Sequence, residues 1–284
     1  MAANVYNRRR VSSEVPNLSN FLARSFDSAL PRQAPAEAGR RLVWRHAGRR
    51  AMQALRGALP QRCELCVGAA GDALLCPACA ESLPALPAAC PVCALPNPAG
   101  AVCGACLLRP PPYAATVAAL VYAFPVDRLL QRLKYGGRLA LADWAAAMLA
   151  AAAARALARR DAAARPDRVV AMPLARSRQR ERGFNQAAEI ARRVARAAGL
   201  PQVDALARVA AGPPQAALPW AGRARNVRGA FAASGDVAGS RIALVDDVMT
   251  TGATVAEAAR TLRRAGAAAV ECWVVARTLP PGTR

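Results

Sequence analysis

The sequence contains very few of the side chains that most often carry proton-transfer catalysis. Its 284 residues include one histidine, His46, and one lysine, Lys134. A single histidine excludes Ser/His/Asp and Cys/His catalysis and metal sites with several histidine ligands. Aromatic residues form only 5% of the chain, which disfavours a nucleic-acid surface built from stacked rings. Lys134 has two equally open interpretations: a retained functional residue, or a chance survivor in an arginine-rich chain.

Acidic residues are also scarce. The chain has 18 aspartate and glutamate residues against 39 lysine and arginine residues, which gives a net charge of +21. Such a charge favours anionic ligands, whether phosphates, nucleic acid or acidic partners. An excess of arginine and alanine also arises from coding bias, so the charge alone does not select among these ligands.

Long hydrophobic segments are missing as well. Residues 1–20 carry charges and no apolar core of a signal peptide. The apolar runs at 113–126 and 145–154 are too short to span a bilayer. We therefore expect a cytoplasmic protein without membrane insertion.

Composition divides the chain into three predicted parts. Residues 1–55 form a basic tail without periodicity, predicted to be disordered apart from a short helix near 40–59. Residues 60–109 are rich in cysteine. After the boundary at Pro110–Pro112, residues 113–280 alternate between strand and helix patterns. The expected strands are 116–123, 168–172, 203–209, 242–245 and 268–276, and the expected helices are 127–135, 139–160, 185–198 and 255–265. This alternation predicts an α/β fold, with a mostly parallel sheet covered by helices on both faces.

Eight of the nine cysteines form four Cys-x-x-Cys pairs. They are Cys63 and Cys66, Cys76 and Cys79, Cys90 and Cys93, and Cys103 and Cys106. Two such pairs complete a tetrahedral thiolate site, which suits zinc. The regular doubled pattern disfavours iron–sulfur ligation, disulfides and thioredoxin-type redox chemistry. We therefore predict two zinc ribbons.

Pairs one and two are expected to share one ion, and pairs three and four the other. The alternative is an interleaved arrangement, with pairs one and three on one ion and pairs two and four on the other. Either arrangement fills all four ligand positions, so both sites are expected to be structural. The ninth cysteine, Cys272, lies in an apolar strand and is expected in the core.

The stretch Arg241–Thr254 combines an apolar strand, two adjacent carboxylates and a loop of threonine and glycine that leads into a helix. Unpaired amides and the helix dipole make such a helix start an anion site. Asp246 and Asp247, directly before the loop, can accept hydrogen bonds from a diol. The stretch is therefore predicted to bind a sugar phosphate.

A second stretch of functional character follows the strand predicted at 168–172. Four arginines occur within seven residues: Arg176, Arg178, Arg180 and Arg182. They follow the carboxyl end of a strand, where ligands bind in open α/β sheets. The guanidinium group suits bidentate contact with phosphate oxygens. A solvated basic loop is the alternative interpretation.

These motifs resemble known families. Residues 241–254 are similar to the phosphoribosyl-pyrophosphate (PRPP) motif of type I phosphoribosyltransferases. The chain resembles the ComF family, phosphoribosyltransferase-like proteins associated with bacterial DNA uptake, over residues 61–278. The elements that carry this resemblance are the cysteine pairs, Leu133–Gly136, Arg182-Gly-Phe-Asn-Gln186, Arg223–Phe231 and the Asp246 motif. Residues 1–50 match nothing in the family, and Gly212–Pro214 departs from its pattern.

The resemblance implies a site for PRPP and Mg²⁺. The 5-phosphate would bind at Thr250, Thr251, Gly252, Ala253 and Thr254. Asp246 and Asp247 would bind the ribose hydroxyls and stabilise positive charge on the ribose ring. Arg176, Arg180 and Arg182 would hold the leaving diphosphate. Mg²⁺ would bridge diphosphate and ribose oxygens.

The resemblance leaves the acceptor and the cellular role open. A nitrogenous base is the expected acceptor, and a link to DNA uptake or nucleobase use is implied. A non-catalytic module that binds PRPP or handles single-stranded DNA, together with competence proteins as partners, is the main alternative. A structural adaptor docked through its zinc ribbons would leave the acidic pair unexplained.

Overall fold

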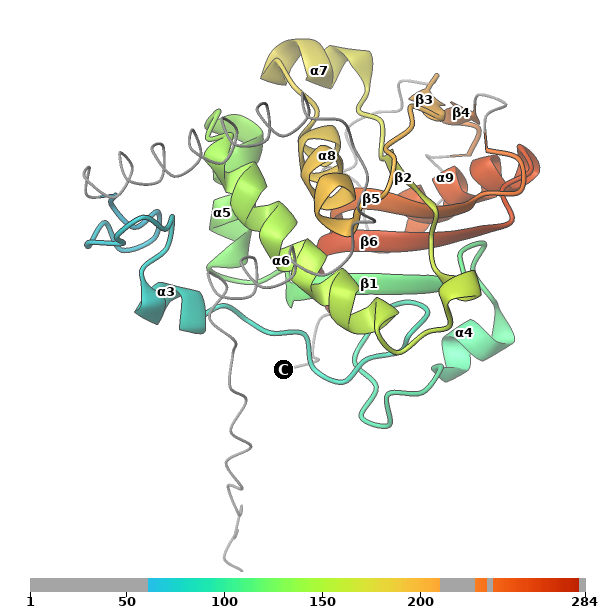
Figure 1. The fold of residues 1–284 in the computed structure, drawn as a ribbon, viewed down its shortest axis with the longest axis horizontal. Helices are drawn as coiled ribbons and strands as arrows, with labels where there is room; N and C mark the ends of the chain where they lie inside the picture. Colours follow the sequence, from blue (N-terminus) through green and yellow to red (C-terminus); the bar gives the residue numbers. More distant parts are fainter. Residues whose placement is uncertain (1–60, 210–227, 234–236, 281–284) are drawn as a thin grey trace, which may run out of the picture. The chain divides into compact units, whose positions relative to one another are not determined.

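The computed structural model describes residues 61–209, 228–233 and 237–280 (Figure 1). These residues belong to one compact unit, Arg56–Arg284. The tail predicted at 1–55, with its short helix near 40–59, and the polar segment at 212–226 lie outside the described residues.

A four-stranded parallel sheet forms the centre of the unit, in the order β1-β6-β5-β2. Its strands are β1 (Ala115–Val121), β2 (Arg168–Ala171), β5 (Arg241–Met249) and β6 (Ala269–Arg277). The predicted parallel sheet is therefore confirmed. One difference concerns the acidic pair: β5 continues through Asp246 and Asp247, which the sequence pattern placed in a turn.

Helices cover both faces of this sheet, as predicted (Figure 1). On one face lie α5 (Val126–Tyr135), α6 (Ala140–Leu157) and α8 (Gln186–Ala198), and on the other lies α9 (Ala253–Arg264). Alternate residues of β5 serve the two faces because successive strand side chains point in opposite directions. Ala243 and Val245 pack with α6 and α8, whereas Ile242 and Leu244 pack with α9.

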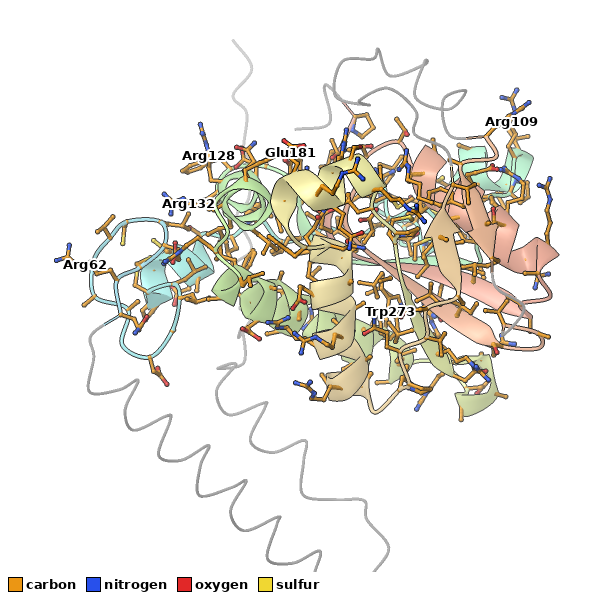
Figure 2. All side chains as sticks on the ribbon, turned by 90° about the horizontal axis from the view of Figure 1, so that it is seen from above. Arg62, Arg109, Arg128, Arg132, Glu181 and Trp273 are labelled. Atoms are coloured by element: carbon orange, nitrogen blue, oxygen red, sulfur yellow. The ribbon has the colours of Figure 1, made fainter. Side chains whose placement is uncertain are left out.

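Alanine makes up 11 of the 18 residues of the long helix α6. Seven of its residues, including Leu141, Ala145 and Leu149, are buried against the sheet and its neighbouring helices. Among the described residues, α6 is the one helix long and apolar enough to cross a membrane by length and composition. Its buried face identifies it as a core helix. Trp273, in the same core, is completely buried and is labelled in Figure 2.

Two segments differ from the sequence prediction. The strand expected at 203–209 is shorter, β3 (Leu206–Arg208), and pairs antiparallel with β4 (Phe231–Ala233) in a separate small sheet. The arginine-rich segment, predicted as a loop, forms helix α7 (Arg176–Arg182). Gly183 ends α7 in the left-handed conformation, at φ 78°, which favours glycine.

Candidate active site and metal centres

A cavity of about 530 Å³ opens where strands β2 and β5 end. Met172 and Pro173 follow β2 into it, and Asp246 to Met249 form the end of β5. Helices α5, α7, α8 and α9 and strand β3 also contribute lining residues. Ligands of open parallel sheets bind at this edge, because loops after adjacent strands leave a crevice there.

Two adjacent carboxylates and the only lysine of the chain meet in this cavity. Asp247 is 5% exposed, and its Oδ2 lies 2.5 Å from the Lys134 Nζ atom on α5. Asp246 is partly exposed, and its Oδ1 accepts a hydrogen bond of 2.9 Å from the Asp247 amide. Lys134 therefore has a partner in the cavity, which favours the functional interpretation over that of a chance survivor.

The two carboxyl groups differ in protonation. Burial, together with the neighbouring Asp247 carboxylate, raises the pKa of Asp246 well above its ordinary value. Burial also acts to raise the pKa of Asp247, but the Lys134 ammonium outweighs it and lowers that pKa. The pKa of Lys134 is raised, because the attraction of Asp247 exceeds the effect of its own burial. These surroundings favour the charged form of Asp247 and disfavour that of Asp246.

The predicted phosphate loop joins β5 to α9. Gly252 precedes the first residue of α9 and has φ 82°, a conformation that side-chain-bearing residues rarely adopt. The Thr251 hydroxyl oxygen accepts a 3.2 Å hydrogen bond from the Ala253 amide. Thr250, Gly252 and Thr254 line the cavity, whereas Thr251 and Ala253 do not. The first turn of α9 therefore faces the cavity beside the acidic pair.

Replacement of Gly252 by alanine is expected to disturb this loop. A Cβ atom there would lie 2.8 Å from the Met249 Cε and 3.3 Å from the Tyr113 hydroxyl. The left-handed backbone adds roughly 1–2 kcal/mol of strain, so we expect Gly252→Ala to lower the Tm by roughly 2–6 °C. Gly199→Ala is the matched control, since Gly199 has φ 67° with open space around it, away from the cavity.

The two glycine variants separate stability from binding. Gly252→Ala and Gly199→Ala should both have a lower Tm than the wild type in a thermal melt. Only Gly252→Ala should also weaken phosphate-ester binding, measured by calorimetry. Equal affinity in both variants would contradict a phosphate role for the loop.

Three arginines line the same cavity as the acidic pair: Arg178 and Arg182 from α7, and Arg208 from β3. The guanidinium of Arg182 lies 4.7 Å from the centre of the Tyr135 ring and donates hydrogen bonds of 3.1 Å to Gln186 and to the Tyr135 hydroxyl. The Nε atom of Arg182 is buried and has no hydrogen-bond partner in the described part of the chain. This side chain is thus held in place with a donor still available.

The helical form of α7 determines which arginines reach the cavity. Arg178 and Arg182 are four residues apart and share one helix face, whereas Arg176 and Arg180 are exposed and do not line the cavity. Arg182 therefore lines the same cavity as the acidic pair. Arg178, which was not assigned to the site from sequence, lines it as well, whereas the predicted Arg176 and Arg180 do not.

Several lining residues were not assigned to the site from sequence. Lys134, Arg178 and Arg208 are charged, and Tyr122 and Tyr135 are two of the few aromatic residues of the chain. Burial lowers the pKa of Arg208, although the Asp246 carboxylate partly offsets this effect. The available signal was the Leu133–Gly136 segment, which carries both Lys134 and Tyr135.

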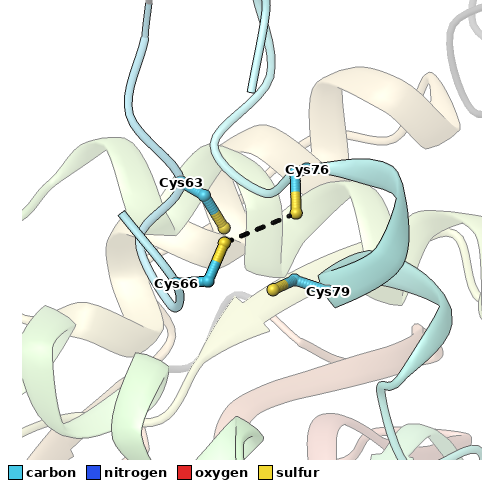
Figure 3. A group of neighbouring side chains, drawn as sticks. All are labelled: Cys63, Cys66, Cys76 and Cys79. Atoms are coloured by element: carbon cyan, nitrogen blue, oxygen red, sulfur yellow. Dashed lines mark hydrogen bonds between the residues drawn. The ribbon is translucent and has the colours of Figure 1, made fainter. Parts of the chain in front are cut away.

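The eight paired cysteines form two separate clusters. Cys63, Cys66, Cys76 and Cys79 converge in the first (Figure 3), and Cys90, Cys93, Cys103 and Cys106 form the second. All sulfur atoms of a cluster lie within 4.8 Å of one another. Consecutive pairs therefore share a site, and the interleaved arrangement is wrong.

Both clusters fit tetrahedral zinc. The Cys66 and Cys76 sulfurs are 3.7 Å apart, as are those of Cys93 and Cys103. Zinc–sulfur bonds of about 2.3 Å in tetrahedral geometry require about 3.8 Å. Burial opposes ionisation of Cys63, yet the backbone N–H groups of its knuckle lower its pKa to about 6. The second cluster repeats this effect at Cys90, whose pKa is also lowered to about 6.

Metal analysis of the purified protein is expected to give two zinc ions per chain. Cys63→Ser/Cys66→Ser should retain one, and Cys103→Ser/Cys106→Ser should also retain one, because each cluster is complete in itself. Spectrophotometric zinc release measures both values. Loss of both ions in either variant would contradict two independent sites.

Comparisons with known families match the cysteine-rich part and the α/β part of the chain separately. Residues 54–107 match the family described as a double zinc ribbon domain, and residues 146–280 match the phosphoribosyl transferase domain. The chain is 36% identical over 225 residues to DNA utilization protein YhgH of Escherichia coli, an alignment that covers 78% of this chain and 99% of that protein. It is 31% identical over 179 residues to Competence protein F of Haemophilus influenzae, covering 62% and 78%.

Among solved structures, the chain is similar to a glutamine PRPP amidotransferase from B. subtilis. The identity is 24% and the TM-score 0.31, over 47% of this chain and 25% of that one. This overlap is partial.

Proposed function

Since this chain belongs to the ComF family, we propose that its α/β domain binds PRPP with Mg²⁺ and transfers the phosphoribosyl group to a nitrogenous acceptor. The observation that carries the proposal is one cavity with three complementary walls. Asp246 and Asp247 form one wall, the start of α9 forms another, and Arg178, Arg182 and Arg208 form the third. A phosphorylated ribose with a leaving diphosphate needs these three kinds of contact.

The sugar phosphate binds between the acidic pair and α9 in this proposal. The amides of the first turn of α9, with Thr250 and Thr254, hold the 5-phosphate at the positive end of the helix dipole. Gly252 has no side chain, so a phosphate can approach the backbone there. The carboxylates of Asp246 and Asp247 accept hydrogen bonds from the ribose hydroxyls.

The arginines take the other end of the substrate. Arg178, Arg182 and Arg208 hold the departing diphosphate, and Arg182 offers its unpartnered Nε donor. Departure of diphosphate leaves positive charge on the ribose ring, which the ionised acidic pair stabilises. Asp246 and Asp247 supply the hard oxygen atoms that Mg²⁺ prefers, and the ion would add charge neutralisation for the diphosphate when bound.

Lys134 controls the charge of the acidic pair. Its ammonium keeps Asp247 ionised before the substrate arrives, since the pKa of Asp247 is lowered by it. The raised pKa of Asp246 means that this carboxyl releases its proton when a cation or a cationic ring binds. We therefore assign Lys134 as a positioning residue of the proposed site.

The acceptor attacks the C1 carbon of the ribose in this proposal. Among the described residues, none that lines the cavity is a histidine. We therefore expect an acceptor nitrogen that is nucleophilic enough by itself, or that loses its proton to a carboxylate of the substrate complex. The names of the relatives, DNA utilization and competence, support an acceptor that is met during the use of DNA.

Diphosphate release tests the proposal. Purified protein is incubated with PRPP, Mg²⁺ and a panel of nucleobases, and diphosphate is measured by a coupled assay. Diphosphate release that depends on a base, and that Asp246→Asn/Asp247→Asn abolishes, supports the proposed transferase activity. PRPP binding by calorimetry without release with any base would instead support the binding-only alternative. Absence of both would contradict the proposal.

A further inference from the structure

Arg277 is a buried cation without a carboxylate partner. It is the last residue of β6 and is 2% exposed. All of its recorded hydrogen bonds go to backbone carbonyls, and no ion pair joins it to a carboxylate in the described residues. Burying a charge is costly unless it is paired, so this guanidinium needs a compensating anion.

The carbonyls that Arg277 contacts belong to two distant parts of the chain. Its Nε donates a 2.9 Å hydrogen bond to the carbonyl of Cys93, a ligand residue of the second zinc cluster. Its Nη1 donates to the carbonyls of Met249, at 2.9 Å, and of Thr250. Met249 and Thr250 lead from β5 into the phosphate loop. One side chain therefore joins a zinc knuckle to the loop.

The same knuckle is fixed to the sheet by a second set of contacts. The Thr116 hydroxyl donates a 2.6 Å hydrogen bond to the Val92 carbonyl, and the Thr116 amide donates one of 2.9 Å to the Pro91 carbonyl. Val92 packs against the apolar residues between the sheet and α9. The knuckle Cys90–Cys93 is thus part of the support beneath the phosphate loop.

The second cysteine cluster lies next to Arg277, since Cys93 contributes both a sulfur atom to the cluster and the carbonyl that accepts the Arg277 Nε hydrogen bond. A zinc ion with four cysteine thiolates would carry a formal charge of −2. In the described part of the chain, no hydrogen bond joins the first cluster directly to the phosphate loop. Its Glu64 instead forms ion pairs with Arg132, at 3.5 Å, and with Arg138, on and after α5.

We propose that the second zinc ribbon, acting through Arg277, holds the phosphate loop in its binding conformation. Zinc in the second cluster fixes the Cys93 carbonyl and balances the charge of Arg277, and Arg277 in turn fixes the carbonyls of Met249 and Thr250. Arg277 is therefore a positioning residue. The part of this inference that concerns PRPP affinity rests on the proposed function, whereas the part that concerns loop order does not.

Amide hydrogen exchange of the 246–256 segment measures loop order without any ligand. Full-length Cys103→Ser/Cys106→Ser removes zinc from the second cluster and keeps Cys93 in place. Cys76→Ser/Cys79→Ser is the matched control in the first cluster. We expect the first variant to speed exchange in this segment about ten-fold and the control to leave it unchanged. Equal exchange in the two variants would overturn the inference.

Arg277→Met tests the link itself. It should speed exchange in the same segment while both zinc ions remain bound, and Arg277→Lys should restore part of the protection. If amide exchange rises equally in α8, Arg277→Met has lost its fold and does not test the link. Thr116→Val then provides the test. That change removes the hydrogen bond of the Thr116 hydroxyl to the Val92 carbonyl and its 4.0 Å contact with the Met249 sulfur, and it should give a smaller rise confined to the loop. An unchanged loop in Thr116→Val would then count against the inference.

PRPP calorimetry adds the functional consequence. Loss of zinc from the second cluster and Arg277→Met should each weaken PRPP binding about ten-fold. If the wild-type protein binds no PRPP, the proposed function fails, but the exchange results still decide whether the ribbon orders the loop.

Discussion

The variant Asp246→Asn/Asp247→Asn is expected to bind PRPP at least about 100-fold more weakly than the wild-type protein. Both carboxylates line the cavity beside the phosphate loop, and with Glu181 of α7 they are its acidic lining residues. Asparagine keeps the shape of each side chain but cannot carry a negative charge. Isothermal titration calorimetry with PRPP and Mg²⁺ gives the affinity directly.

The control for this variant must remove the same charge elsewhere. Asp143→Asn/Asp161→Asn does so at two exposed positions away from the cavity and should bind PRPP as the wild type does. Undiminished affinity of Asp246→Asn/Asp247→Asn would eliminate the assignment of the acidic pair.

The single change Asp246→Asn should not lower the Tm at neutral pH. Because the pKa of Asp246 is raised in the folded protein, the protein loses stability as the pH rises through that pKa and this carboxyl ionises. Asparagine does not ionise and avoids this loss.

Lys134→Met is expected to weaken PRPP binding about 10- to 100-fold at neutral pH and to move its pH dependence. Without the ammonium, burial acts to raise the pKa of Asp247, so the charged form is disfavoured at both carboxyls. The affinity of Lys134→Met for PRPP should therefore recover as the pH increases. The affinity of the wild-type protein should also rise with pH, but there only Asp246 has to lose a proton. The pH profile of the wild type should therefore lie at lower pH than that of Lys134→Met.

Lys134→Arg distinguishes charge from packing in this experiment. Arginine keeps the positive charge and should retain the wild-type position of the pH profile, even if its larger head group costs some affinity. Calorimetric titrations at several pH values give the profiles of all three proteins. A Lys134→Met profile that coincides with that of the wild type would show that Lys134 does not set the charge of Asp247.

Much of the fold follows from local pattern. The strand expected at 268–276 is β6 (Ala269–Arg277), and the helix expected at 185–198 is α8 (Gln186–Ala198). Both are long and strongly periodic, and α8 has a side-chain cap, since the Asn185 oxygen accepts from the Ala187 amide. Helix α7 was missed because its charged residues suggested a loop. Arginine is in fact a good helix former, and Gly183 marked the helix end.

The candidate site divides in the same way. Asp246, Asp247 and Gly252 occur together in one short stretch, so the sequence was sufficient to group them. Lys134 and Arg208 reach the same cavity only through the packing of α5 and the position of the small sheet. Which pairs of cysteines share a metal was also a matter of three-dimensional proximity, which the regular spacing did not determine.

The position of Lys134 in the cavity allows the site to be followed by chemical labelling. Because the chain has no other lysine, an amine-reactive reagent can modify only one ε-amino group, and it lies in the site. Such reagents attack the neutral amine, and the raised pKa of Lys134 keeps that form rare. The rate of acylation at this residue, followed by mass spectrometry of intact protein, would therefore report whether the ion pair is closed or has been opened by a ligand.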